Sequence, residues 1–233
     1  TPKTSSAASD VYKRQGIKRI GEMAARFGFG EAFNFGLPGE NRGLIPTPAW
    51  KRKTFGQAWH AGETLITSIG QGFILCTPLQ LAVMTSRLVN GGRPVLPRLM
   101  KNERAEIQKR KSLQLSPQHL HTVLKGMDKV VNGSQGTARK VVDQSMKFQF
   151  GGKSGSVQVK RISLDERERG KLKNKDRPWH ERDHAMFVAF APLKSPRYVV
   201  SVVVEHGGGG STMAAPIARD ILAEALRLNP SKL

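Results

Sequence analysis

The chain has 233 residues, 38% of them hydrophobic, which is enough apolar sequence for one large or two small folded units. Its formal net charge of +20 favours anionic partners such as nucleic acid, acidic lipid headgroups or an anionic polymer. Because Cys76 is the only cysteine, an internal disulfide and a zinc site built on cysteines are excluded. Cys76 lies between the apolar Leu75 and the capping residue Thr77, so we expect a buried structural thiol. No apolar run reaches 18 residues and no signal peptide opens the chain, so we expect any membrane anchor to lie outside it.

The first half of the chain reads as helices and loops. Residues 1–15 are polar and lack any apolar period, so we expect a disordered or non-native flank. Apolar residues at helical spacing predict a helix over 16–27, followed by ordered loops with short helical turns over 34–72. A capping residue followed by proline then predicts the start of two further helices, 77–90 and 116–132.

The pattern changes after residue 145 to the period of two that is typical of strands. It predicts strands over 147–160, 184–192 and 198–206, with a closing helix over 214–228. The stretch 161–183 is highly charged and lacks an apolar face, so we expect an exposed insertion or mobile hairpin tip. Helices followed by an antiparallel sheet and a C-terminal helix define an α+β fold.

The first predicted strand contains the unusual sequence FGGKSGSVQVK, residues 150–160. Gly152-Lys153-Ser154 ends like a phosphate-binding loop, but that motif needs a glycine where Lys147 stands, so the phosphate reading is excluded. Two explanations remain for the missing packing side chains. A substrate backbone could lie against the strand beside Gly155, or the small residues could simply accommodate a neighbouring helix.

Other segments of the sequence also resemble a known family. FGGKSGSVQV resembles the Lys-Thr/Ser-Gly motif of penicillin-binding proteins and serine β-lactamases. SIGQGFILCTPLQLAVMTSRLVNGG, GSQGTARKV and FVAFAPLKSPRYVVSVVVEHGGGG resemble, in order and spacing, the class B penicillin-binding proteins and within them the penicillin-binding protein 2 group. This resemblance implies a penicillin-binding-protein/serine β-lactamase-like transpeptidase fold, here incomplete. Residues 16–233 would be its C-terminal portion, with 161–183 as a charged insertion.

The resemblance also implies an activity, D,D-transpeptidation of peptidoglycan stem peptides through a serine acyl-enzyme. Lys153 matches the motif lysine, which would bind the terminal carboxylate of the substrate and hold the proton-relay network. Ser154 and Ser156 would contribute hydroxyl contacts, and the backbone N–H of Ser156 would donate to the oxyanion. Gly155 would leave room for the substrate backbone. No cofactor and no metal ion are implied.

The sequence departs from the family where the nucleophile is expected. No Ser-x-x-Lys and no Ser-x-Asn occur, and Ser163-Leu164-Asp165, which has a related form, lies on the wrong side of the third motif. We therefore expect the C-terminal part of a transpeptidase domain that is inactive by itself. The alternatives are a catalytically silent scaffold or interaction domain and, from charge alone, a basic nucleic-acid-binding module.

The expected partners follow from the family. They are peptidoglycan stem peptides, β-lactam antibiotics and other cell-wall synthesis proteins, with no nucleic acid. The parent protein would act at the periplasmic face of the bacterial inner membrane.

Two histidines invite a weaker hypothesis. His184 and His206, beside Asp183 and Glu205, could suggest a metal site or an acid–base pair. Alternation along strands sends sequence neighbours to opposite faces, so we expect ordinary strand and loop histidines. We likewise expect Gly207–Gly210 to be a flexible turn into the last helix rather than an anion cradle.

Overall fold

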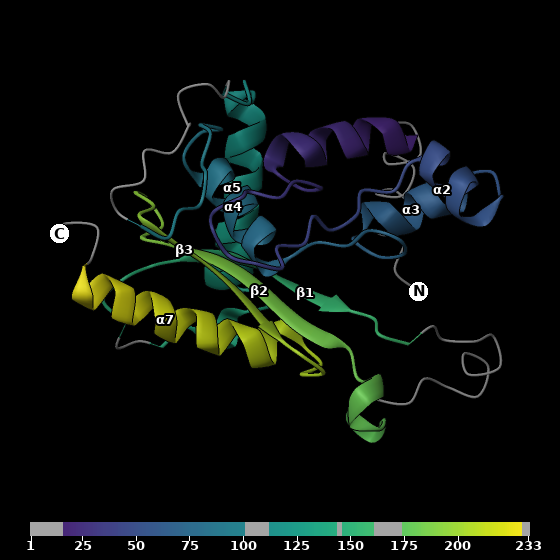
Figure 1. Cartoon of the computed structure of the whole chain (residues 1–233). Helices are drawn as coiled ribbons and strands as arrows, with labels where there is room; N and C mark the ends of the chain where they lie inside the picture. The colour runs from purple at the N-terminus through teal and green to yellow at the C-terminus, as the bar shows by residue number, and fades with distance from the viewer. Residues whose placement is uncertain (1–15, 101–111, 144–145, 161–173, 230–233) are drawn as a thin grey trace. The chain divides into compact units, whose positions relative to one another are not determined.

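The structure is a computed structural model that describes residues 16–100, 112–143, 146–160 and 174–229 (Figure 1). The chain divides into two compact units. Unit 1 comprises residues 1–84 and 94–113, and unit 2 comprises residues 85–93 and 114–233.

The helices that the sequence predicted with most detail are present. Residues 16–27 are helical, α4 spans Pro78–Val89 and α5 spans Pro117–Asn132. The start of α4 is a reciprocal capping box: the Thr77 hydroxyl accepts from the Gln80 N–H at 3.1 Å, and the Gln80 carboxamide oxygen accepts from the Thr77 N–H at 3.0 Å. The capping residue and proline therefore located this helix start correctly.

The stretch expected to hold loops with short helical turns contains two helices of two turns, α2 (Pro48–Phe55) and α3 (Ala61–Ser68). A buried ion pair joins them. The Lys51 ammonium, on α2, lies 2.5 Å from the Glu63 carboxylate on α3 and donates to the Ala58 carbonyl at 2.8 Å. Lys51 is only 2% exposed, so a lysine that sequence alone would place in solvent is part of the interior of unit 1.

Glu63→Gln is expected to destabilise unit 1 by about 3 kcal/mol at neutral pH, because it leaves the buried Lys51 ammonium without its counter-charge. Burial raises the pKa of Glu63, but the hydrogen bonds from the His60 N–H and from Lys51 outweigh it, and the net pKa is lowered below 4.5. A lowered folded pKa gives stability that is present above 4.5 and is lost as pH falls through the folded value. The difference between wild type and variant in urea unfolding should therefore shrink at acid pH.

A matched control is the exposed pair of Glu224 and Arg227, whose side chains lie 2.6 Å apart on the last helix. Glu224→Gln should leave the unfolding midpoint unchanged, because exposed ion pairs are screened by solvent. If the two substitutions changed the free energy of unfolding equally, the buried pair in unit 1 would contribute no more to stability than the exposed pair.

Unit 2 contains a three-stranded antiparallel sheet in the order β1-β2-β3 (Figure 1). The strands are β1 (Gly151–Val157), β2 (His184–Ala191) and β3 (Tyr198–Val204), each within a predicted range. β2 pairs with both neighbours, so among the described residues β1 and β3 form the edges of the sheet. The antiparallel α+β architecture predicted from the sequence is confirmed.

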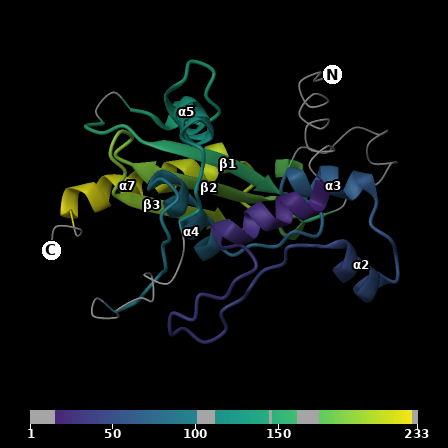
Figure 2. The same ribbon diagram turned by 90° about the horizontal axis from the view of Figure 1, so that it is seen from above.

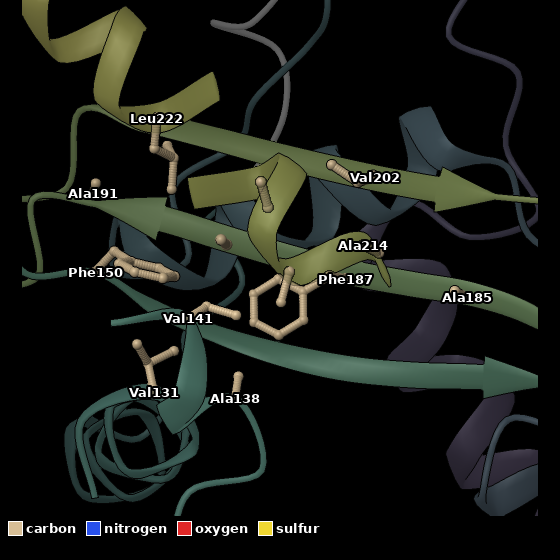
Figure 3. Close-up of a cluster of buried hydrophobic side chains, with 13 residues drawn as sticks. Val131, Ala138, Val141, Phe150, Ala185, Phe187, Ala191, Val202, Ala214 and Leu222 are labelled. Carbon is tan, nitrogen blue, oxygen red and sulfur yellow. The ribbon is translucent and has the colours of Figure 1, made fainter. Parts of the chain in front are cut away.

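Helix α7 (Ala215–Leu228) packs along one face of the sheet, as the two views in Figures 1 and 2 show. A cluster of buried apolar side chains fills the space between them (Figure 3). Val131 and Ala138 reach this cluster from α5 and the loop that follows it, and Leu222 reaches it from α7. Ala185, Phe187, Ala189 and Ala191 alternate along β2 and all belong to this cluster, so they define the core face of the sheet.

Part of the predicted charged insertion has defined structure. Residues 174–183 contain two single-turn helices, Asn174–Asp176 and Trp179–Glu181. The Asn174 side-chain oxygen accepts from the Asp183 N–H at 3.0 Å, and the Asp183 carbonyl accepts from the Gly208 N–H at 2.8 Å. This end of the insertion therefore packs on the turn after β3, whereas residues 161–173, like the expected flank 1–15, lie outside the described residues.

Candidate functional site

The four motif residues occupy the middle of β1, and they divide between the two faces of the sheet. Ser154 pairs with the core residue Phe187, so Ser154 and Ser156 share the core face. Lys153 and Gly155 lie on the opposite face. The four residues lie on one strand, as the sequence predicted, and alternation places Lys153 and the two hydroxyl groups on opposite faces. They can act on one ligand only at the edge of the strand, which both faces border.

The Lys153 side chain bends back to this edge. It is exposed, and its Nζ donates to the Ser154 carbonyl at 2.5 Å. The Ser154 carbonyl is therefore within reach of an exposed ammonium group, and Ser156 lies two residues further along the same strand.

Gly151 and Gly152, at the start of β1, have a structural explanation. A Cβ on Gly151 would lie 2.6 Å from the Phe190 ring, and a Cβ on Gly152 would lie 2.5 Å from the Phe187 ring and 2.7 Å from the Val188 carbonyl oxygen. The aromatic rings of β2 therefore cover these two glycines, and a larger residue could not be accommodated without displacing the core.

Gly155 differs from both. A Cβ there would meet only the Met186 Cβ at 3.6 Å, which is an ordinary van der Waals contact. On the core side a close backbone approach does occur, because a Cβ on Gly210 would lie 2.4 Å from the Gly155 carbonyl oxygen and 2.2 Å from that of Met186. The fold thus requires glycine at position 210, and it leaves the face of β1 that carries Lys153 open beside Gly155.

One neighbour of the site was not singled out from the sequence. The Thr137 hydroxyl, in the loop after α5, lies 3.5 Å from the Ser154 hydroxyl. The two residues are 17 positions apart, and the sequence carried no signal for their contact beyond the placement of Thr137 in the block GSQGTARKV.

The two histidines lie together at the far end of the same strand pair. His184, which pairs with the last residue of β1, accepts through Nδ1 from the His206 N–H at 2.9 Å, and the ring centroids are 4.6 Å apart. The His206 Nδ1 lies 2.9 Å from the Arg182 carbonyl, an acceptor only, so this nitrogen carries its proton. The Trp179 ring contacts His206 with a centroid distance of 4.3 Å and an interplanar angle of 59°. These contacts hold the turn after β3, which agrees with structural histidines.

Among the described residues, no group of three His, Cys, Asp or Glu side chains is arranged to hold a metal ion. Cys76 is exposed, so the prediction of a buried thiol is wrong. Its apolar neighbour Leu75 is itself 60% exposed, which explains why the local sequence was misleading.

The profile of the penicillin-binding protein transpeptidase domain matches residues 4–223. The chain therefore belongs to the penicillin-binding protein transpeptidase family, and the resemblance noted from its motifs is confirmed. The match includes residues 4–15, part of the stretch expected to be a flank.

Curated relatives and solved structures agree with this assignment. The peptidoglycan D,D-transpeptidase MrdA of Haemophilus influenzae is 36% identical over 233 residues, which cover 94% of this chain and 35% of the relative. MrdA of Escherichia coli is 30% identical over 216 residues, 89% of this chain and 33% of the relative. The chain spans about a third of the length of these curated relatives.

Two structures of penicillin-binding protein 2 share the fold. That of Pseudomonas aeruginosa, in complex with WCK 5153, matches with a TM-score of 0.79 and 37% identity, over 96% of this chain and 47% of that chain. That of Helicobacter pylori, in complex with MreC, matches with a TM-score of 0.79 and 30% identity, over 94% of this chain and 38% of that chain.

Proposed function

We propose that this chain is part of a peptidoglycan D,D-transpeptidase of the penicillin-binding protein 2 type, which cross-links stem peptides in cell-wall synthesis. The observation that carries the proposal is the Lys153-Ser154-Gly155-Ser156 motif on an edge strand of the sheet. An edge strand offers backbone hydrogen bonds to an extended peptide, and the motif adds a cation and hydroxyl groups. The family match over residues 4–223 supports the same function.

The proposed reaction has two steps. A serine of the full-length protein attacks the carbonyl carbon of the D-Ala-D-Ala bond, and the terminal D-alanine leaves with a proton on its amine. The acyl group then passes to an amine of a neighbouring stem peptide, which restores the serine hydroxyl. In this scheme Lys153 binds the terminal carboxylate and supports the proton relay. The Ser156 N–H stabilises the oxyanion, and Ser154 and Ser156 contribute hydroxyl contacts.

The same proposal covers partners and place. Stem peptides are the substrates, β-lactam antibiotics the inhibitors, and other cell-wall synthesis proteins the partners, by analogy with the MreC complex of the Helicobacter pylori protein. The full-length protein would act at the periplasmic face of the inner membrane. In this chain, no helix of the described residues is long and apolar enough to cross a bilayer.

The 233-residue chain is expected not to become covalently labelled by a fluorescent penicillin. Acylation needs a serine activated by a nearby base, and the sequence contains no Ser-x-x-Lys. The full-length protein, under the same conditions, should be labelled stoichiometrically on one serine outside these 233 residues. Gel fluorescence and mass spectrometry of the labelled peptide measure both results.

The outcomes separate the remaining functions. Stoichiometric labelling of the chain itself would overturn the prediction. A folded full-length protein that no penicillin acylates would favour the catalytically silent scaffold, to which the missing motif points. Salt-sensitive DNA binding at physiological ionic strength would instead favour the nucleic-acid module.

A further inference from the structure

The loop that follows α5, residues 133–138, places the Thr137 hydroxyl next to the candidate site. Thr137 is exposed, and its Oγ1 lies 3.5 Å from the Ser154 Oγ, where either atom could be the donor. Ser154 belongs to the motif, whereas Thr137 has no part in the reaction as described so far. Thr137 can influence the Ser154 hydroxyl only if the loop that carries it is held in place.

The backbone on both sides of Thr137 is fixed. The Gly136 N–H donates to the Gly133 carbonyl and the Ala138 N–H donates to the Val130 carbonyl, each at 2.9 Å. Ala138 is 1% exposed within the core cluster, so the residue after Thr137 is anchored by packing as well.

The two glycines of the loop are required by its fit against α5. A Cβ on Gly133 would lie 2.5 Å from the Lys129 carbonyl oxygen, and a Cβ on Gly136 would lie 2.5 Å from the Val130 carbonyl oxygen. Backbone oxygens at the end of a helix cannot move aside easily, so the loop keeps one path and presents Thr137 at one place.

The end of α5 is tied to the start of β1. The Asn132 side-chain amide donates to the Phe150 carbonyl at 3.0 Å, and Val131 and Phe150 both belong to the core cluster. The Thr137 loop and the Ser154 strand are thus attached to each other within a few residues on either side. Their proximity is a property of a packed junction rather than of two independent surface loops.

We propose that Thr137 is a positioning residue of the active site, in an inference that rests on the proposed function. Its hydroxyl donates to the Ser154 oxygen, which leaves the Ser154 proton free to point to the anionic group of a stem peptide or β-lactam at the edge of β1. A hydroxyl has one proton and two lone pairs, so a donor behind Ser154 fixes the direction in which Ser154 itself donates. The ligand favoured by this arrangement carries a carboxylate close to the scissile bond.

The test uses the full-length protein and a fluorescent penicillin, with stopped-flow acylation to separate the apparent dissociation constant from the limiting rate. Thr137→Val is close in shape and lacks the hydroxyl. It is expected to weaken the apparent affinity by roughly 5- to 10-fold, as for the loss of a hydrogen bond between uncharged groups, with a smaller effect on the limiting rate. Thr137→Ser should restore the affinity to within about twofold, because it restores the donor.

Two comparisons exclude a merely structural effect. Thr122→Val removes another exposed threonine hydroxyl of unit 2. This hydroxyl donates within α5 to the Gln118 carbonyl at 2.8 Å, away from the motif, so the substitution should leave acylation unchanged. In a Ser154→Ala background, Thr137→Val should change the apparent affinity for penicillin little further, because Thr137 is proposed to act only through the Ser154 hydroxyl.

The outcomes are distinct from those that test the function itself. A wild-type protein that is not acylated contradicts the proposed function. A wild-type protein that is acylated, with Thr137→Val binding penicillin at the parental affinity, overturns the role of Thr137 alone. Loss without rescue by serine, or effects of Thr137→Val and Ser154→Ala that simply multiply, would also overturn it.

Discussion

In a full-length protein that carries the upstream serine, Gly155→Val is expected to fold normally and to lose penicillin acylation, to below about 1% of the parental rate. The structure leaves room for a Cβ at this position, which would meet only the Met186 Cβ at 3.6 Å. Valine also favours strands, with intrinsic differences within about 1 kcal/mol. The thermal midpoint should therefore stay close to that of the parent.

The loss of activity has a steric cause. Gly155 shares its face with Lys153, so a branched side chain would stand beside the ammonium group that is proposed to receive the carboxylate. A substrate displaced by about 1 Å from the reacting serine can lose about 100-fold in rate. Stopped-flow acylation and thermal unfolding of the same preparation measure the two halves of the prediction.

A neighbouring glycine supplies the control. Gly152→Val should destabilise the protein, because its Cβ alone would lie 2.5 Å from the Phe187 ring. If Gly155→Val were folded and acylated at the parental rate, β1 would be a structural strand only. If it unfolded like Gly152→Val, the open space beside Gly155 would not explain the choice of glycine.

These glycines show where sequence reasoning stops. The sequence left two explanations open for the glycines of β1, space for a substrate or contact with a neighbouring helix, yet the Phe187 and Phe190 rings account for Gly151 and Gly152. The rings belong to β2, more than 30 positions along the chain. Local sequence reveals that a strand lacks side chains, but only the pairing register reveals what occupies their place.

The elements themselves were predictable because their determinants are local. Each of these signals depends on residues a few positions apart. They are the Thr77–Gln80 capping box, the proline at the start of α5 and the apolar alternation before and after residue 192. Long-range contacts were not predictable in this way. The buried Lys51, the His184–His206 pair and the proximity of Thr137 to Ser154 all depend on how separate elements pack.

Lys153→Ala in the same full-length protein is expected to slow penicillin acylation by about 10²- to 10³-fold while the fold is retained. An ammonium about 4 Å from a carboxylate at an effective dielectric of 20 contributes roughly 4 kcal/mol before desolvation costs, and each 1.4 kcal/mol is about tenfold. Lys153 is exposed and does not belong to the buried core cluster, so its truncation should not lower the thermal midpoint.

The controls separate a local cation from overall charge. Lys147→Ala removes another exposed lysine four residues before β1 and should leave acylation unchanged, although the net charge falls equally. Lys153→Arg keeps the charge but replaces a compact ammonium by a planar fork, so we expect partial activity. Because an electrostatic contact with an anionic ligand is screened by salt, added salt should slow the parent more than Lys153→Ala. Parental acylation by Lys153→Ala, or an equal loss in Lys147→Ala, would remove Lys153 from the site and leave the carboxylate without its proposed partner.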